Sequence, residues 1–162
     1  MATKTKRTAR EKLLDDKDLP RLETIPAKLH ATWGRGKFVI ARPRDVDALM
    51  RRVPKGKLTT VDELRAALAA MHGADTACPM TTGIFVNLAA KAADEAESEG
   101  RTRVTPYWRT LKARGELNAK FPGGVEHVRA RLEAEGHEVV ARGKRLFVAD
   151  HTARLVRPRQ RA

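Results

Sequence analysis

The sequence predicts an α+β fold, because helical patterns fill the middle of the chain and strand patterns occur on either side of them. Three amphipathic helix patterns follow one another between residues 45 and 99, and a glycine-containing turn joins the second to the third. Residues 138–148 alternate around Gly143-Lys144 and predict a β-hairpin. Together these elements favour a winged helix-turn-helix-like DNA-binding domain with added short β-hairpins.

The first helix is expected over residues 45–53, where apolar residues recur at i, i+3, i+4 and i+7 from Val46. Pro54 ends it, since proline cannot continue a helix. Before this helix, Phe38-Val39-Ile40 predicts a short strand inside an otherwise irregular lead-in that covers residues 19–44.

The second helix opens at a predicted capping box. In such a box the hydroxyl of Thr60 accepts a backbone N–H bond, and the Glu63 side chain reaches back to the capping residue. The helix is expected to run to about His72, with Gly73 as its stop.

Pro79 suits the first turn of the third helix, which ends in an acidic patch, residues 94–99, before Gly100. The expected buried stripe of this helix has one residue per turn: Ile84, Leu88 and Ala92. A fourth helix is expected from Val125 to a stop at Gly136.

The net charge points to a polyanionic partner. The chain has 33 Lys and Arg against 20 Asp and Glu, a formal charge of +13 and a pI near 10.6, which is the electrostatic signature of nucleic-acid binding. Both ends are strongly basic and lack apolar periodicity. We expect residues 1–18 to form a mobile basic arm and residues 151–162 a basic tail that add phosphate contacts, or else disordered tails without a partner.

Several classes of site are not expected. A single cysteine, Cys78, excludes an internal disulfide and a multi-cysteine zinc site, so we expect no metal and no cofactor. No apolar run approaches the ~18 residues of a membrane span. The expected protein is soluble, has no membrane partner and is cytoplasmic, or nucleoid-associated if bacterial.

Residues 105–137 contain the densest group of motifs. Pro106-Tyr107-Trp108-Arg109 precedes a Gly123-Gly124 turn, and residues 132–136 read Leu-Glu-Ala-Glu-Gly. This order resembles the active-site module of the alkylguanine-DNA alkyltransferases, which carry Pro-Cys-His-Arg, then a Gly-Gly turn opening a helix that ends in Leu-x-x-Glu-Gly. Residues 53–60 also match that family's Pro-x-Gly-x-x-Thr-Thr turn.

The resemblance covers residues 45–137, an alkyltransferase-like winged helix domain, and leaves residues 138–150 as a C-terminal β-hairpin. Tyr107 stands in the position of the alkyl-accepting cysteine, and Trp108 in that of the activating histidine. A phenol with a pKa of about 10 is a poor nucleophile at neutral pH, so alkyl transfer at this position is not expected. The resemblance is to the alkyltransferase-like branch, whose members bind damaged DNA without repairing it directly.

The resemblance implies a lesion pocket lined by the tetrapeptide and by the glutamate that orients the family's histidine: Pro106, Tyr107, Trp108, Arg109 and Glu135. Aromatic faces suit stacking on an extruded base. The alternative is that the aromatic residues belong to the core, and for Trp108 we favour that alternative. Arg109 is chiefly structural in the family.

The third helix is the expected recognition helix, which in the family enters the minor groove. The family's arginine finger falls near Ala89 in this chain and is missing. Expected DNA contacts lie at two helix N-termini and along the recognition helix: Thr59, Thr60, Thr81, Thr82, Asn87 and Lys91. For the threonines the alternative is a capping role alone, which we favour for Thr60.

Three functions follow from these patterns. The first is a non-enzymatic protein that recognises alkylated guanine in duplex DNA and flags it for repair, with nucleotide excision repair proteins as partners. The second is a general DNA-binding or transcription- and nucleoid-associated protein that senses no damage. The third is a methyltransferase that uses Cys78, which lies near a helix N-terminus that would lower the pKa of its thiol, although a buried structural cysteine is the simpler interpretation.

Overall fold

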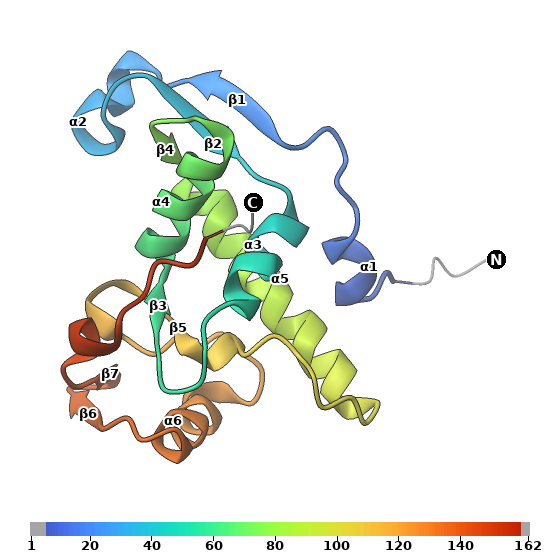
Figure 1. The fold of residues 1–162 in the computed structure, drawn as a ribbon, viewed down its shortest axis with the longest axis vertical. Coiled ribbons are helices and arrows are strands. Elements are labelled where there is room, and N and C mark those ends of the chain that lie inside the picture. The colour runs from blue at the N-terminus through green and yellow to red at the C-terminus, as the bar shows by residue number, and fades with distance from the viewer. Residues whose placement is uncertain (1–5, 160–162) are drawn as a thin grey trace.

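The computed structural model describes residues 6–159, in which helices and three small β-sheets surround one long helix (Figure 1). That long helix, α5 (Pro79–Ser98), packs against α3 (Pro43–Arg51) and α4 (Val61–His72). The α+β prediction is confirmed, and so are the three helices expected in succession.

The lead-in is more regular than the sequence indicated. The elements before α3 are α1 (Ala9–Leu13), β1 (Arg21–Thr24), η1 (Ala27–Leu29), α2 (His30–Trp33) and β2 (Lys37–Ile40). A third strand, β4 (Thr76–Ala77), follows α4 and completes a small sheet with the two strands of the lead-in. In this sheet β1 pairs antiparallel with β2, and β2 pairs parallel with β4. Every residue of β1 is exposed, so this strand leaves no alternating apolar pattern by which the sequence could reveal it.

One of the two hydrogen bonds of the predicted capping box at the start of α4 is present. The Thr60 hydroxyl accepts the Glu63 N–H at 3.2 Å, and Gly73 ends the helix in the left-handed region at φ 64°. The Glu63 side chain does not reach back to the cap. It accepts a hydrogen bond from Arg157 at 2.7 Å, because the chain end passes close to this helix.

The buried face of α5 is only partly the one expected. Ala92 is buried as predicted and Leu88 packs half-buried against the main core cluster, but Ile84 is 60% exposed. The side chains that pack inward are mostly small: Thr82, Val86, Ala89, Ala90, Ala92, Ala93 and Ala96. Small side chains let α3 and α4 approach closely. The assignment of Ile84 to the core was wrong because it followed the size of the side chain, whereas the tertiary contact is made largely by alanines.

The second half of the chain closes the core from below in Figure 1. Its elements after α5 are η2 (Tyr107–Arg109), β5 (Thr110–Leu111), η3 (Ala113–Gly115), α6 (Gly124–Ala134), β6 (Val139–Arg142), β7 (Arg145–Val148) and η4 (His151–Arg154). β3 (Thr59–Thr60), which precedes α4, pairs parallel with β5, and β6 and β7 form the expected hairpin. Gly123 and Gly124 both have φ of 80° or more, which explains a Gly-Gly pair before α6. The β6–β7 hairpin follows α6 and does not directly follow α5, the expected recognition helix. A wing beside that helix therefore stays a prediction.

Both basic ends are anchored where the structure describes them, which corrects the expected arm and tail. α1 packs against α5 and buries Leu13. Near the other end, the Leu58 N–H donates to the Arg154 carbonyl at 2.9 Å, and the Val156 N–H donates to the Leu58 carbonyl at 2.8 Å. Residues 1–5 and 160–162 of the predicted arm and tail lie outside the described residues.

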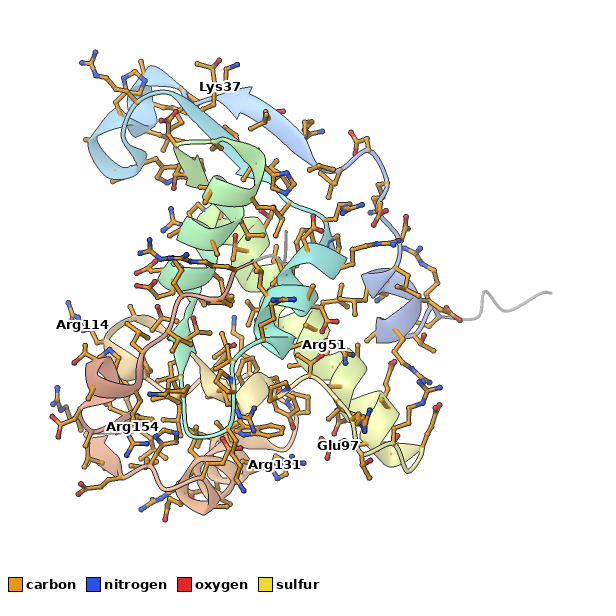
Figure 2. All side chains as sticks on the ribbon, in the orientation of Figure 1. Lys37, Arg51, Glu97, Arg114, Arg131 and Arg154 are labelled. Carbon is orange, nitrogen blue, oxygen red and sulfur yellow. The ribbon has the colours of Figure 1, made fainter. Side chains whose placement is uncertain are left out.

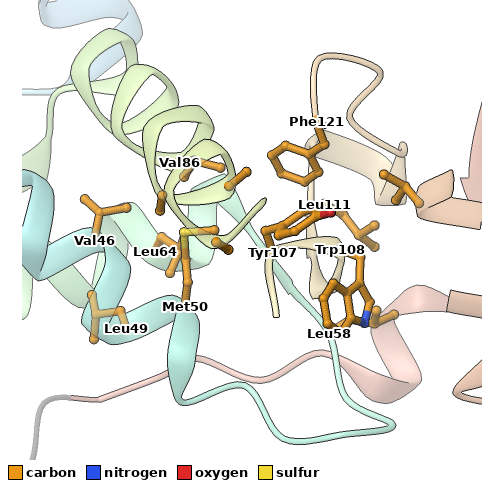
Figure 3. Packing of buried hydrophobic residues seen from close by; sticks show 14 of the residues in the cluster. Val46, Leu49, Met50, Leu58, Leu64, Val86, Tyr107, Trp108, Leu111 and Phe121 are labelled. Carbon is orange, nitrogen blue, oxygen red and sulfur yellow. The ribbon is translucent and has the colours of Figure 1, made fainter. Parts of the chain in front are cut away.

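The main core cluster runs from α3 and α4 across α5 to η2 and α6 (Figure 3). Met50 and Leu64 meet Val86 on one side of it, and Tyr107 and Phe121 continue it on the other. The tetrapeptide is therefore part of the packed interior and fixes the lower half of the molecule to the three helices.

Candidate nucleic-acid interface

The solvent-facing ridge of α5 is the clearest candidate for a binding surface. Met80 is 71% exposed and Ile84 60%, and the half-buried Asn87 and the exposed Lys91 continue the same face at helical spacing. Within the described residues, Met80 and Ile84 are two of the four large apolar side chains that are exposed, and they lie about one helical turn apart on the same face. The ridge therefore has the composition of a contact surface.

Two segments flank this ridge. α1 lies against α5 on one side, and the two helices enclose a groove of about 700 Å³ whose lining includes Lys6, Lys12 and Lys91. On the other side, the Asn118 side-chain amide donates to the side-chain oxygen Oδ1 of Asn87 at 3.1 Å. This hydrogen bond fixes the loop that carries the exposed Lys120. Lysines therefore border the ridge on both sides.

These lysines are not neutralised by carboxylates. Within residues 6–159 the cation of every ion pair is an arginine or a histidine, and no lysine takes part. The acidic residues that line the groove do not offset the charge of Lys91 by direct contact, and Glu95 is already used by α1. The flanks of the ridge keep their positive charge for a partner.

Most of the threonines expected to bind phosphate are not available. Thr59, Thr60 and Thr82 are buried, which leaves no surface for a DNA contact. The hydroxyls of Thr81 and Thr82 donate to the Cys78 carbonyl, so both have local capping-type roles. Asn87 and Lys91 do lie on the candidate surface, although Asn87 is already bonded to Asn118.

Tyr107 does not line an open pocket, which corrects the predicted lesion site. Its side chain is fully buried, and its ring packs edge-on against Phe121 and Trp108 at centroid distances of 5.4 and 5.3 Å. Burial raises the pKa of the Tyr107 phenol, and its hydroxyl has no hydrogen-bond partner among the described residues. The phenol is a core side chain, so this position supports neither base stacking nor alkyl transfer.

Trp108, the next residue, borders a surface cavity of about 430 Å³. The guanidinium of Arg131 covers the indole at 4.2 Å from the ring centroid and pairs with Glu97. Figure 2 shows Arg51, Arg131 and Glu97 gathered near the lower end of α5, and Pro106 and Arg109 complete this side of the cavity. This cavity, and not Tyr107, is where the tetrapeptide meets solvent.

Arg109 and Glu135 form an ion pair with side-chain exposures of only 14% and 8%. Arg109 Nη2 lies 2.6 Å from a Glu135 oxygen, and Nη1 donates to the Val53 carbonyl at 2.8 Å. Burial favours the protonated Glu135 carboxyl, but the hydrogen bonds from Arg109 outweigh it and lower the Glu135 pKa. Both residues therefore act structurally, by joining α6 to the end of α3.

A second contact fixes the chain just before the tetrapeptide. The Thr105 hydroxyl donates to a buried Asp47 oxygen of α3 at 2.6 Å. Because Thr105 and Arg109 both bond to the α3 region, the turn between them has one orientation, with Tyr107 inward and Trp108 at the cavity.

Cys78 is not placed to accept an alkyl group. It is buried in a small cluster with Ile25 and Phe38, separate from the cluster that holds Tyr107. Its backbone N–H donates to the Val39 carbonyl at 3.0 Å, so the residue joins the start of α5 to β2. The structural interpretation accounts for its position.

Four residues that the structure places at these sites were not predicted as site residues: Met80, Ile84, Lys120 and Arg131. Lys120 and Arg131 lie outside the sequence motifs, and Ile84 was assigned to the core. Their roles depend on which segments meet in space. The spacing of Met80, Ile84, Asn87 and Lys91 along one helical face is the signal from which the ridge could have been found.

The described residues contain no group of three or more His, Cys, Asp or Glu side chains arranged to hold a metal ion. Among the same residues, no helix is both long and apolar enough to cross a membrane.

Comparison with known proteins gives little direct guidance. No protein-family model matches the chain, and no curated protein matches it either. Among solved structures, the chain is similar to S. pombe Atl1 in complex with damaged DNA containing O6-carboxymethylguanine, with 19% identity, coverage of 72% of this chain and 94% of that chain, and a TM-score of 0.47. At this level of similarity, neither the DNA nor the lesion of that complex can be assigned to this chain.

Proposed function

We propose that this protein is a non-enzymatic duplex DNA-binding protein that presents the exposed ridge of α5 to a groove of the DNA. The observation that carries the proposal is the combination of the exposed Met80 and Ile84 with lysines on both sides of the same helix that form no ion pair within residues 6–159. Apolar side chains can contact bases, and lysines neutralise the phosphates that border a groove.

The dimensions of the ridge suit this role. From Met80 to Lys91 the helix rises about 16 Å, at about 1.5 Å per residue. That is the length of about five base pairs of B-DNA, at about 3.4 Å for each. Lysines at the ends and sides of such a ridge are placed to meet phosphates of both strands.

Salt dependence tests the proposal. If Lys6, Lys12, Lys91 and Lys120 each neutralise one phosphate, log affinity should fall against log salt with a slope of about −3.6 or steeper, at about 0.9 per contact. A fluorescent duplex titrated with the full chain at several salt concentrations measures this slope. Binding that does not weaken with salt, or no binding at low salt, contradicts the proposal.

We further propose that the protein transfers no alkyl group. The acceptor position holds a sealed phenol, and Cys78 is buried in a separate cluster. Intact-mass spectrometry after incubation with a methylguanine duplex should show the unmodified mass. A stoichiometric gain of one methyl group would falsify this part of the proposal.

Damage recognition is a second candidate function, favoured by the solvent-open cavity beside Trp108. We propose that this cavity, and not the position of Tyr107, receives an extruded alkylated guanine, and that the bound complex marks the lesion for nucleotide excision repair proteins. The Arg131 guanidinium, which lies over the indole of the buried Trp108, supplies a flat surface on which a base can stack.

Affinities for otherwise identical duplexes with guanine and with alkylguanine test this second function. We expect tighter binding of the alkylated duplex, and Arg131→Ala should reduce that preference without changing the salt slope. Equal affinities for both duplexes exclude damage recognition and leave the general DNA-binding function.

A further inference from the structure

Two glutamates at the C-terminal end of α5 hold α1 in place: Glu95 in the last turns of the helix and Glu99 at its C-cap. The Glu95 carboxylate accepts the backbone N–H groups of Ala9 at 2.8 Å and Arg10 at 3.1 Å. These are N–H groups of the first turn of α1, which have no partner inside the helix. Glu95 therefore satisfies the start of a helix that is some 85 residues away in the chain.

The second glutamate binds the side chain of the same segment. Both terminal guanidinium nitrogens of Arg10 bond to the two oxygens of Glu99, one of them at 2.8 Å. The Arg10 hydrogen bond lowers the pKa of Glu99, so this glutamate stays charged at neutral pH. A two-point contact of this type fixes orientation as well as position.

α1 cannot hold this position by itself. It has five residues, far fewer than the ~12 that an isolated helix needs for even marginal stability. The Thr8–Glu11 capping box is a contact within the segment, whereas Leu13 is buried by packing into the main core cluster. Contact with α5 therefore determines where the basic side chains of α1 point.

The consequence is the placement of charge around the groove. Lys12 of α1 and Lys6, three residues before the helix begins, lie at the groove whose other wall contains Lys91. On a detached segment these lysines would sample many positions and would lose conformational entropy on binding. When docked, they stand beside the α5 ridge before any partner arrives.

We propose that the segment 6–13, which consists of α1 and the three residues before it, is a docked phosphate clamp, in which Glu95 and Glu99 hold Lys6 and Lys12 where they bind the same stretch of duplex DNA backbone as Lys91. This inference rests on the proposed DNA-binding function. It assigns two acidic residues a positive role in binding a polyanion.

That role reverses the usual effect of charge. Removing a carboxylate near a DNA-binding surface ordinarily strengthens binding, because it removes repulsion from phosphate. Here removal of Glu95 and Glu99 releases the clamp, so binding should weaken although the protein becomes more positive.

The test uses the full chain with Glu95→Ala and Glu99→Ala combined. Affinity for a duplex should fall at least about fivefold at 0.1 M salt, and the salt slope should become shallower by about 1.8, the share of two lysines. Unchanged or tighter binding would overturn the clamp. The matched control is Glu126→Ala with Glu133→Ala on α6, two glutamates that pair with Arg129 and change the charge equally. That control should bind as well as the parent protein or slightly better.

A second pair of variants keeps the test decisive if loss of both glutamates disturbs folding. Lys6→Gln with Lys12→Gln should reproduce the loss of affinity in the parent chain. The same lysine changes should add little once Glu95 and Glu99 are replaced, because the two sets act through one element. Additive losses would overturn the clamp. If the parent protein binds no DNA, the proposed function itself fails. If the parent protein binds DNA and the Glu95 and Glu99 variant binds with the same affinity and salt slope, the clamp alone fails.

Discussion

The interior around Tyr107 and the face made by α1 and α5 differ in almost every physical property. Tyr107 is fully buried, contacts two other aromatic rings and has a hydroxyl without a partner. The α1–α5 face carries exposed Met80 and Ile84 and lysines that take part in no ion pair within residues 6–159.

This difference separates stability from binding. The tetrapeptide around Tyr107 is part of the packed core, where side chains fit closely and a change in side-chain volume lowers stability. The face without a recognisable motif keeps its charge and its apolar side chains in contact with solvent. Variants in the first region should therefore change folding, and variants in the second should change DNA binding.

The largest expected effect is that of Tyr107→Ala, which should lower the free energy of unfolding by about 3–5 kcal/mol because it leaves a cavity among aromatic rings. Urea denaturation measures the loss. Tyr107→Phe should leave stability unchanged or raise it by about 1 kcal/mol, since the lost hydroxyl is buried and unpaired. The folded fraction of both variants should keep its DNA affinity within about twofold. A selective loss of alkylguanine preference would instead restore Tyr107 to a binding role.

A comparison within α5 sharpens the boundary between the two regions. Val86→Ala should cost about 2 kcal/mol of stability, because Val86 is buried against α3 and α4. Ile84→Ala should change stability by less than about 0.5 kcal/mol, since Ile84 is exposed, and should weaken DNA binding. Thermal melts and duplex titrations on both variants measure this contrast. The reverse order of stabilities would mean that α5 is rotated relative to its described position.

Lys91→Gln combined with Lys120→Gln should weaken DNA binding and leave the stability of the protein unchanged. Two lost phosphate contacts should make the salt slope shallower by about 1.8 and weaken binding roughly tenfold at 0.1 M salt. The melting temperature should not change, because neither lysine forms an ion pair within the described residues. Lys28→Gln with Lys37→Gln, near β1 and β2, is a control of equal charge. An equal loss in the control would show that net charge alone, and not this face, determines binding.

The smallest expected effect is a dependence of stability on pH. Burial lowers the pKa of His137, against the attraction of Glu135 and with added repulsion from Arg154 and Arg109. A lowered pKa in the folded state means that the unfolded chain binds the proton more readily. This contribution to stability is present above the unfolded pKa of about 6.5 and is lost as the pH falls from there through the folded value.

Urea unfolding between pH 8 and pH 5 should therefore show stability decreasing towards pH 5, and His137→Gln should reduce that slope. His127→Gln, which changes an exposed histidine, should leave it in place. The Glu135 contribution lies lower, from about pH 4.3 downwards, because its pKa is also lowered. A slope that survives His137→Gln would assign the pH effect to another group.

Local signals predicted much of the fold. The period of apolar residues located α3, the Thr60 cap and Gly73 defined α4, and the two-residue turn at Gly143-Lys144 defined the β6–β7 hairpin. Each of these is decided by residues close together in the chain. β1 was missed because all its side chains are exposed, and the docking of α1 was missed because its partners, Glu95 and Glu99, are distant in sequence.

The sequence by itself determined the composition of the candidate site: a strongly basic chain, an α+β helix succession, and a tetrapeptide that contains a phenol and an indole. Only the tertiary structure decided which of those groups face solvent. It turned Tyr107 inward, left Ile84 outside, and placed Lys6 and Lys12 beside Lys91. The physical reason is that the identity of a side chain is local, whereas its burial depends on which distant segments pack against it.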